Sequence, residues 1–340
     1  MGVTGLSHVL AVDGGNSKSD VAVVRSDGAL LALERGPGFR PHVDGVEASV
    51  EGLAPAVQAA LARAGHPRIA LVKACMANAD LPVEEEQIAA DLRRRGWAER
   101  VDVVNDTFAV LRAGTDEPRG VAVVCGAGIN CVGLLPDGRT ARFLAIGRIT
   151  GDWGGGADLA EEVMWWAVRC EDGRGPSTAL SPAVAEHFGA ASATAVAEQV
   201  HLGAIPPARL HELVPVLFDT ADAGDEVARS VVLRQADEVV SFASVALRRL
   251  DLDRERTDVV LGGGVLTARN PLLISAITTR LARTAPLCTV RVLSAPPVLG
   301  AMLLGLDDVT AGRPTQRQEV AAAQVPLREQ LAATPFGRGA

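Results

Sequence analysis

The 340-residue sequence lacks the long apolar runs and the clustered cysteines that mark several classes of protein. No apolar run reaches the roughly 18 residues that a membrane-spanning helix needs. The first dozen residues carry no Lys or Arg ahead of an apolar stretch, unlike a signal peptide. The five cysteines are odd in number and widely spaced and form no C-x-x-C pair, which argues against a disulfide framework or a zinc site. We therefore expect a cytoplasmic protein without a membrane partner.

The sequence is also short of positive charge, with 33 Lys and Arg against 41 Asp and Glu, a net charge of −8 and a pI near 5.4. Such a balance provides no field that attracts nucleic acid or anionic lipid, so we expect neither as a partner. The apolar share of 48% and the charged share of 22% are those of an ordinary globular protein. A chain of this length suits two domains better than one core.

The most informative feature of the sequence is an internal repeat. Residues 9–28 (VLAVDGGNSKSDVAVVRSDG) and 121–138 (VAVVCGAGINCVGLLPDG) both contain an expected strand, a glycine-rich turn, a second strand and an Asp-Gly turn. A third expected strand and then helices follow each copy. The pattern predicts a duplicated α/β fold. The alternative is a chance similarity, because glycine turns between valine-rich strands are common.

The glycine-rich turn of each copy has the composition of a phosphate-binding turn. In the first copy, backbone N–H groups, polar side chains and one ammonium group can face a phosphate while a carboxylate holds hydrated Mg²⁺; the residues are Asp13, Gly14, Gly15, Asn16, Ser17 and Lys18. In the second copy, small residues let the backbone approach a second phosphate group; they are Gly126, Ala127 and Gly128, followed by Asn130. The alternative for either turn is a hairpin with polar surface residues.

Three further motifs accompany the paired turns and complete a resemblance to a known family. They are Asn105-Asp106 at an expected strand end, Gly151-Asp152 in the segment GRITGDWGGG, and Gly262-Gly263-Gly264 after a late strand. With them, residues 9–306 resemble the sugar-kinase, heat-shock-chaperone and actin (ASKHA) superfamily. Within it they are most similar to the BadF/BadG/BcrA/BcrD ATPase group and its eukaryotic-type N-acetylglucosamine kinases.

The resemblance implies a duplicated actin-like (ribonuclease H-like) α/β fold of two domains with an ATP cleft between them. The expected domains are 1–115, which carries the sugar loop, and 116–298, which carries a helical insertion. A helix at 299–310 is expected to return to the first domain. Residues 311–340 are polar and aperiodic, so we expect a flexible tail there.

The resemblance also implies ATP and Mg²⁺ as cofactors. Asp13 to Lys18 would form the first phosphate turn, with Asp13 holding Mg²⁺ through water, and Gly126 to Asn130 would form the second. The turn against which adenosine lies would be Gly262, Gly263 and Gly264, where the lack of side chains lets the purine approach the backbone.

Asp106 takes the position of the catalytic base in this resemblance. A carboxylate at a strand end in a cleft can accept the proton of a sugar hydroxyl while that oxygen attacks the γ-phosphoryl group. The alternative is that Asp106 caps the helix that starts at Thr107.

The residues that the resemblance places beside the sugar are Arg40, His42, Asn105, Asp106, Asn130, Gly151 and Asp152. The sequence departs from the family at two of these places. Trp153, Gly154 and Gly155 stand where the family has Glu-Gly-Ser, and Arg40 stands where the eukaryotic-type kinases have Asn. Arg40 indicates either an anionic group on the substrate or a surface salt bridge.

The sequence therefore predicts an ATP-dependent kinase that phosphorylates the primary (6-) hydroxyl of an amino sugar. N-acetylglucosamine is the leading acceptor, and glucosamine or another hexosamine is the alternative.

A rival hypothesis, the ATPase activator of a 2-hydroxyacyl-CoA dehydratase, needs thiolates for a shared iron–sulfur cluster. Cys125 and Cys131 form the nearest pair, but they lie in or just after the phosphate turn. An ATP-switched scaffold, chaperone or filament would need insertions for which the chain has no room. Because family members often dimerise, a homodimer is one further expectation.

Overall fold

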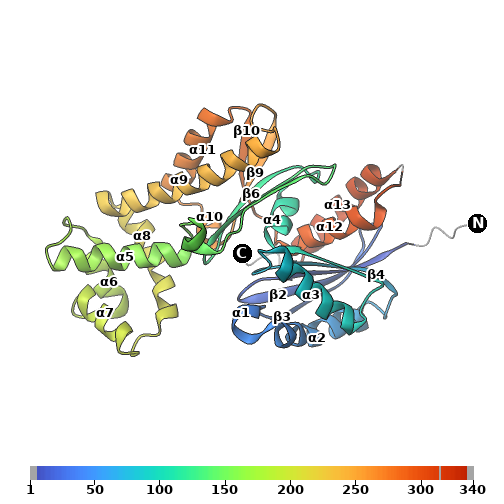
Figure 1. Ribbon diagram of the computed structural model, residues 1–340, viewed down its shortest axis with the longest axis horizontal. Coiled ribbons are helices and arrows are strands. Elements are labelled where there is room, and N and C mark those ends of the chain that lie inside the picture. The colour runs from blue at the N-terminus through green and yellow to red at the C-terminus, as the bar shows by residue number, and fades with distance from the viewer. Residues whose placement is uncertain (1–5, 314, 335–340) are drawn as a thin grey trace, which may run out of the picture. The chain divides into compact units, whose positions relative to one another are not determined.

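The computed structural model describes residues 6–313 and 315–334 of the protein. Within these residues, the strands form two five-stranded sheets (Figure 1). The first sheet consists of β1 (His8–Gly14), β2 (Lys18–Arg25), β3 (Leu30–Pro37), β4 (Ile69–Met76) and β5 (Arg100–Asn105). The second consists of β6 (Gly120–Cys125), β7 (Ile129–Leu134), β8 (Thr140–Arg142), β9 (Thr257–Gly262) and β10 (Cys288–Val292).

Both sheets have the same strand order, which confirms the predicted duplication. The order is β3-β2-β1-β4-β5 in the first sheet and, read from the other edge, β8-β7-β6-β9-β10 in the second. Each sheet thus places two later strands beside the first strand of a three-stranded meander. In the first sheet β1, β4 and β5 run parallel to one another, and in the second β9 and β10 do so. The α/β class expected from the repeat is the observed one.

Helices connect and cover the strands of both sheets. They are α1 (Pro41–Asp44), α2 (Val46–Arg63), α3 (Pro82–Arg95), α4 (Thr107–Gly114), α5 (Gly156–Glu171), α6 (Leu180–Phe188), α7 (Ala193–His201), α8 (Leu213–Asp222), α9 (Glu226–Arg249), α10 (Gly264–Thr267), α11 (Pro271–Thr284), α12 (Val298–Thr310) and α13 (Gln316–Ala332), with the 3₁₀ turns η1 (Gly147–Thr150) and η2 (Pro207–Glu212). None of the helices in the described ranges combines the length and the apolar character that a membrane crossing requires.

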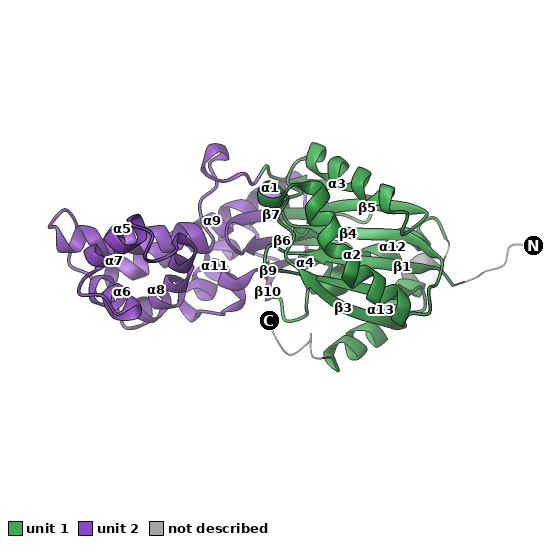
Figure 2. Cartoon of the chain, turned by 90° about the horizontal axis from the view of Figure 1, so that it is seen from below, with its two compact units in different colours: residues 1–122, 132–144, 293–340 green, residues 123–131, 145–292 purple. Residues whose placement is uncertain are grey.

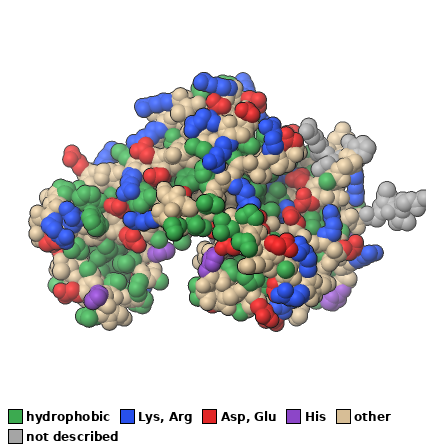
Figure 3. Space-filling model, in the orientation of Figure 1, with side chains coloured by type: hydrophobic (Ala, Val, Ile, Leu, Met, Phe, Trp, Pro, Cys, Tyr) green, Lys and Arg blue, Asp and Glu red, His purple; other side chains and the backbone are tan. Residues whose placement is uncertain are grey.

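The chain divides into two compact units (Figure 2). Unit 1 contains residues 1–122, 132–144 and 293–340, and unit 2 contains residues 123–131 and 145–292. The expected second domain, 116–298, therefore contributes residues 116–122, 132–144 and 293–298 to unit 1. On the face seen in Figure 3, acidic and basic side chains are interspersed over both units.

The core of unit 1 follows from the alternation of side chains along its strands. Leu10 and Val12 face one side of the sheet, where they pack with Leu53 of α2 and Leu92 of α3 in one buried cluster. Val9 lies on the opposite face, and α12 approaches it so closely that a Cβ on Gly305 would stand 2.4 Å from a Val9 methyl group. The parallel strands are thus covered on both faces, as βαβ connections require.

The expected flexible tail at 311–340 is wrong for its central part. Helix α13 spans Gln316–Ala332 and packs against α12 and β3. Its buried side chains are Val320, Ala323, Leu327 and Leu331, which recur at helical spacing and give the segment an apolar stripe to bury. Residues 335–340, also part of the expected tail, lie outside the described residues.

Unit 2 combines the glycine-rich strand ends of the second sheet with a helical layer. Helix α9 packs against α8 and α11, and α5 packs against α6, α7 and α8. Val163 and Ala167 of α5 and Val231 and Val239 of α9 are buried in this layer. The helical insertion that we expected within the second domain is thus observed.

Candidate active site

Three strands of the first sheet end side by side, and the predicted polar residues of unit 1 lie at these ends. Gly14 of β1 pairs with Met76 of β4, and Met76 pairs with Asn105 of β5. Asp13 precedes Gly14 and Asp106 follows Asn105, so both carboxylates lie at one edge of the sheet. The carboxyl ends of parallel strands are where α/β proteins bind their ligands.

The first glycine-rich turn is held in place by backbone hydrogen bonds to two neighbouring segments. Within the turn, Gly15 N donates to Lys18 O at 3.0 Å. Outside it, Gly14 O accepts from the N–H of Ala77 at 2.7 Å, and Gly15 O accepts from the N–H of Phe39 at 2.8 Å. The turn is therefore fixed before any ligand arrives, which is the condition for backbone N–H groups to hold a phosphate.

The sugar loop, which comprises residues 36–45 and carries Arg40 and His42, touches the first glycine-rich turn at Gly38. A Cβ on Gly38 would stand 2.1 Å from Asn16 O, so this position excludes every side chain. Asn78 joins the two segments from a third direction, because its Nδ2 donates to Asn16 Oδ1 at 2.8 Å and to Phe39 O at 3.4 Å. Asn78 has a φ of +61°, a conformation that Asn adopts more readily than most residues. The side chains of Ser17 and Lys18 are exposed.

Asp13 is a partly buried carboxyl whose pKa is raised well above its ordinary value. Burial is the main cause, and the carboxylates of Asp106 and Asp20 add to it, while Lys18 and Arg35 oppose it. A cation beside Asp13 would stabilise its ionised form, so the donor set fits a bound divalent ion.

Asp106 occupies the N-cap position of α4, but the alternative that it caps this helix is wrong. Its side chain makes no capping hydrogen bond. The neighbouring Asn105 takes that role, since its Oδ1 accepts from Thr107 N at 3.0 Å and from Thr107 Oγ1 at 2.6 Å. Burial, followed by the carboxylate of Asp80, raises the pKa of Asp106 to about 6. Asp106 is thus a carboxylate of increased basicity at a strand end.

Asp80 lies beside Asn105 and Asp106, although no sequence pattern predicts it there. Its Oδ1 accepts a hydrogen bond from Asn105 Nδ2 at 2.9 Å. Burial and the nearby Glu84 raise the pKa of Asp80 to about 6. The residue stands in the loop between β4 and α3, where no motif marks it. Asp80 reaches Asn105 only because β4 pairs with β5, and a pairing of strands that are distant in the sequence cannot be read from a local pattern.

The two distinctive residues of the sugar loop are both more than half exposed. Arg40 forms an ion pair with Asp44 at 3.3 Å, and its side chain is 54% exposed. His42 Nε2 lies 3.5 Å from Glu84 Oε1, and its side chain is 57% exposed. The observed contact of Arg40 is thus the surface salt bridge, one of the two alternatives that its position left open.

The glycine-rich turn of unit 2 supports the start of helix α5. Gly126 N donates to Gly128 O at 3.0 Å, while Gly126 O accepts from Gly156 N at 2.7 Å. Gly155 has a φ of +85°, and a Cβ there would stand 2.3 Å from Gly128 O. The turn and the helix start therefore pack backbone against backbone, which leaves no room for a side chain between them.

The third glycine segment follows β9 and contacts the same turn. Gly262 ends β9, Gly263 has a φ of +81°, and Gly264 begins α10. A Cβ on Gly263 would stand 2.3 Å from Cys125 O. By contrast, a Cβ on Gly126 or Gly264 would meet nothing within 4 Å. These two glycines leave open space that a ligand can fill.

That open space belongs to a cavity of about 500 Å³ in unit 2. Its lining combines apolar side chains with the carboxylates of Asp219 and Asp222 and the amide of Asn270, a mixture that ligand pockets commonly have. The lining residues are Gly126, Gly156, His211, Val214, Pro215, Phe218, Asp219, Asp222, Gly264, Val265, Ala268, Arg269, Asn270 and Pro271. The predicted adenosine contact at Gly264 lines this cavity, whereas Gly262 and Gly263 are not among its lining residues.

The remaining predicted residues of unit 2 lie on two separate segments. Gly151 has a φ of +83°, and Asp152 behind it is nearly buried and accepts a hydrogen bond from Thr150 Oγ1 at 2.5 Å. Asn130 is on β7, where its Oδ1 accepts from Cys131 N at 2.6 Å.

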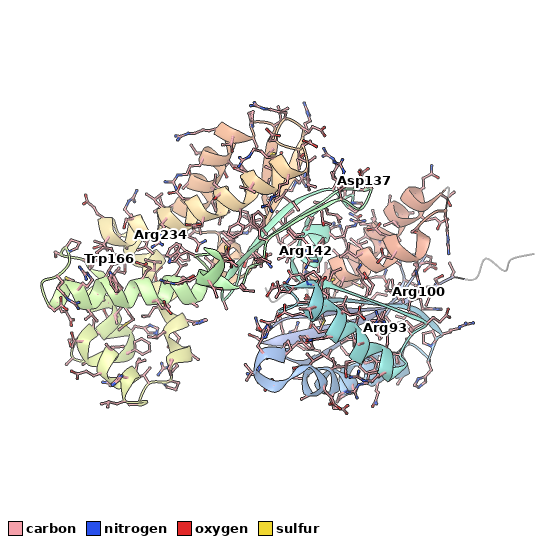
Figure 4. The ribbon with its side chains drawn as sticks, viewed as in Figure 1. Arg93, Arg100, Asp137, Arg142, Trp166 and Arg234 are labelled. Atoms are coloured by element: carbon pink, nitrogen blue, oxygen red, sulfur yellow. The ribbon has the colours of Figure 1, made fainter. Side chains whose placement is uncertain are left out.

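Trp153, which replaces the acidic residue of the family pattern, is buried and stacks under an arginine. The guanidinium carbon of Arg234 lies 3.8 Å from the centre of the Trp153 ring. Arg234 and Trp166, both labelled in Figure 4, each contact the carboxylate of Glu162, at 3.0 and 3.1 Å. An aromatic and cationic stack thus occupies the place of that acidic side chain.

The residues present fit an ATP-dependent site without a dedicated metal cage. Across residues 6–313 and 315–334, no group of three or more His, Cys, Asp or Glu side chains could hold a metal ion by itself. Mg²⁺ in kinases is usually held by one or two carboxylates, water and the nucleotide phosphates. Asp13 beside a phosphate turn meets that requirement.

The chain is similar to known proteins over most of its length. The BadF/BadG/BcrA/BcrD ATPase family matches residues 10–305. The N-acetylmuramic acid/N-acetylglucosamine kinase of Clostridium acetobutylicum is 24% identical over 270 residues, which are 78% of this chain and 88% of that protein. The N-acetyl-D-glucosamine kinase of Dictyostelium discoideum is 20% identical over 317 residues, which are 88% and 97% of the two chains. A solved structure from Chromobacterium violaceum, provisionally named an N-acetylglucosamine kinase, matches with a TM-score of 0.66 and 22% identity and covers 88% of this chain and 98% of its own.

Proposed function

The chain belongs to the BadF/BadG/BcrA/BcrD ATPase family, and from that premise we propose that it is an ATP-dependent kinase acting on the primary (6-) hydroxyl of an amino sugar. N-acetylglucosamine is the leading acceptor, because it appears in the names of both curated relatives. The observation that carries the proposal is the pair of carboxylates, Asp13 and Asp106, at one strand edge beside a preformed phosphate turn.

Each unit contains residues that this proposal assigns to the nucleotide. In unit 1, Asp13 to Lys18 hold phosphate groups, and Asp13 holds Mg²⁺ through water. In unit 2, Gly126 to Asn130 approach a second phosphate group, and the cavity at Gly264 takes the adenosine. When bound, Mg·ATP supplies an electrophilic phosphoryl group whose charge the metal and the backbone dipoles stabilise.

Asp106 is the general base for the acceptor hydroxyl. With a pKa of about 6, it is ionised at neutral pH and is more basic than an exposed aspartate. Its carboxylate accepts the proton of the sugar hydroxyl as that oxygen becomes the nucleophile. Asn105, Asn130, Gly151 and Asp152 orient the sugar ring.

Two residues of the sugar loop bear on which sugar is the phosphoryl acceptor. In this proposal His42, whose Nε2 lies 3.5 Å from Glu84 Oε1, faces the sugar ring. Arg40 is already paired with Asp44, which weakens the case for an acidic sugar. Glucosamine and other neutral or cationic hexosamines are therefore the main alternatives to N-acetylglucosamine.

The two rival functions have less support. Cys125 and Cys131 are fully buried, and burial raises the pKa of both thiols, so they are poorly suited to hold an iron–sulfur cluster. An ATP-switched binding protein would hydrolyse ATP without regard to any sugar.

A cytoplasmic homodimer is retained as part of the proposal, and sedimentation of the purified protein tests the dimer.

The first experiment measures ADP release from Mg·ATP with N-acetylglucosamine, glucosamine, N-acetylmannosamine, N-acetylmuramic acid and glucose. We expect strong turnover on one amino sugar and a loss of about 10²- to 10⁴-fold in Asp106→Asn, the range in which a general base contributes. Asp137→Asn is the matched control, because Asp137 is an exposed carboxylate in the β7–β8 turn (Figure 4). An absence of turnover on every sugar while ATP still binds would overturn the kinase proposal.

A further inference from the structure

The loop between β4 and α3, residues 77–81, contacts every predicted segment of unit 1. The N–H of Ala77 donates to the phosphate turn at Gly14 O, at 2.7 Å. The side chain of Asn78 reaches the phosphate turn and the sugar loop, and that of Asp80 reaches Asn105 beside the proposed base. No sequence motif marks this loop.

The contact between Asp80 and Asn105 has a fixed direction. Asn105 Oδ1 accepts from both the backbone N–H and the hydroxyl of Thr107, so that oxygen faces α4. The NH₂ group of Asn105 therefore faces away from the helix and needs an acceptor, which Asp80 Oδ1 provides at 2.9 Å. Asn105 is itself 3% exposed, so an unpaired NH₂ group would be costly.

The backbone of Asp80 is equally well fixed. Its N–H and that of Leu81 donate to Glu84 Oε2 at 3.0 and 2.9 Å, which forms the start of α3. Its carbonyl accepts from Arg142 Nη2 at 3.4 Å, and Arg142 also binds Glu85 of α3 with two hydrogen bonds (Figure 4). The Asp80 carboxylate is thus held at one place beside Asn105 and Asp106.

We propose that Asp80 is a positioning residue of the phosphoryl-transfer site, which orients the Asn105 amide and places a second carboxylate beside the base Asp106. The inference rests on the proposed function, since it assumes that Asp106 is the base. Asp80 acts through its neighbours and forms no bond to the reacting atoms. Its neutral counterpart Asn would keep an acceptor oxygen for Asn105 and remove only the charge.

The charged groups around this pair come from several elements of unit 1. Asp13 of β1 faces Asp106, and Glu84 of α3, His42 of α1 and Arg142 of β8 face Asp80. Glu84 raises the pKa of Asp80, whereas His42 and Arg142 lower it. After burial, the carboxylate of Asp80 is the cause that raises the pKa of Asp106 to about 6.

The test is the pH profile of kcat/KM for the preferred sugar. In Asp80→Asn we expect the acid limb to move to lower pH by about one pH unit, because a neighbouring negative charge no longer opposes ionisation of Asp106. The KM for the sugar should change little, since Asn105 keeps its acceptor. Asp80→Ser is a second neutral variant that retains an acceptor oxygen, so the readout does not depend on one substitution folding.

Two further variants separate the two parts of the proposal. Asp80→Ala removes both the charge and the acceptor, so we expect the same displaced acid limb and a KM for the sugar raised about tenfold. Glu86→Gln removes one exposed negative charge from α3 and should leave the profile unchanged, because its partner is Arg93 on the solvent side.

The outcomes distinguish this inference from the proposed function. If the profiles of Asp80→Asn and Asp80→Ser coincide with that of the parent protein while Asp106→Asn abolishes turnover, the role of Asp80 is refuted and the kinase proposal stands. If Asp106→Asn keeps near-normal turnover, the base assignment fails and the inference fails with it. A displaced limb in Glu86→Gln as well would show a general charge effect and would overturn the specific role of Asp80.

Discussion

Asp106→Asn should stabilise the folded protein at neutral pH while it abolishes turnover. A carboxyl whose pKa rises from its ordinary value of 3.8 to about 6 on folding is harder to ionise in the native state. Between these two pH values the native state binds more protons than the unfolded chain, so the free energy of unfolding falls as pH rises. Asparagine has no such titration and avoids the loss.

The size of the effect follows from the same two pKa values. Above pH 7, the folded parent protein is less stable by about 3 kcal/mol than it would be with a neutral side chain at this position. About half of this difference develops below pH 5, and the rest develops between pH 5 and pH 7. Interaction with Asp80 and Asp13 spreads the loss over several carboxyls, so double variants should not be additive.

Thermal unfolding of the parent protein and of Asp106→Asn, followed side by side from pH 5 to pH 8, tests this reasoning. We expect the melting temperature of the variant to exceed that of the parent by an amount that increases with pH up to about pH 7. Asp137→Asn, which changes an exposed carboxylate, should show no such increase. A difference that is independent of pH, or a variant less stable than the parent at pH 8, would refute the argument from burial.

Two other substitutions test the packing of unit 1. Gly300→Ala should lower the free energy of unfolding by about 3 kcal/mol or more, since the new Cβ would stand 1.8 Å from Ala109 O. Gly52→Ala in α2 is the control, because its new Cβ makes only an ordinary contact and should leave the stability unchanged or increase it. Chemical denaturation of both variants measures the difference. Lys73→Met should lower the free energy of unfolding by about 2 kcal/mol, because the Lys73 side chain is 6% exposed and forms ion pairs with Asp102 and Asp308. These two carboxylates are about half exposed, so water hydrates them when the lysine is lost. The raised pKa of Lys73 predicts an equal loss from pH 7 to pH 9, and a loss confined to one end of that range would contradict the ion-pair explanation.

The fold was predictable from the sequence because its main signal is local and occurs twice. Both meanders have valine-rich strands with a glycine-rich turn and an Asp-Gly turn in the same order, and this pattern can be read from neighbouring residues alone. The tail was wrong for a different reason. Val320, Ala323, Leu327 and Leu331 do recur at helical spacing, but Pro326 and the many polar residues between them obscure the stripe.

The candidate site was predictable where a turn or a strand end carries the signal, and not elsewhere. Asp13 lies at the end of the buried strand β1 and Asp106 directly follows β5, so their positions could be expected from local sequence. Asp80 lies in a short loop, and its contact with Asn105 depends on how β4 and β5 are aligned. Trp153 was recognised as a departure from the family, but its stacking under Arg234 depends on the packing of α9. Such contacts join residues that are distant in the sequence, and no local pattern records them.

The placement of α12 has a consequence for the order in which the protein can fold during synthesis. The strands of the first sheet are complete once residue 105 has been made, yet Gly305 of α12, which packs against Val9, is made about 200 residues later. At the usual rates of translation, that interval lasts roughly 10 to 40 s. During this time one apolar face of the first sheet lacks the cover that α12 provides. A nascent chain of this protein is therefore exposed to misassociation while unit 2 is being made, and a chain that ends before α12 would present the uncovered face permanently.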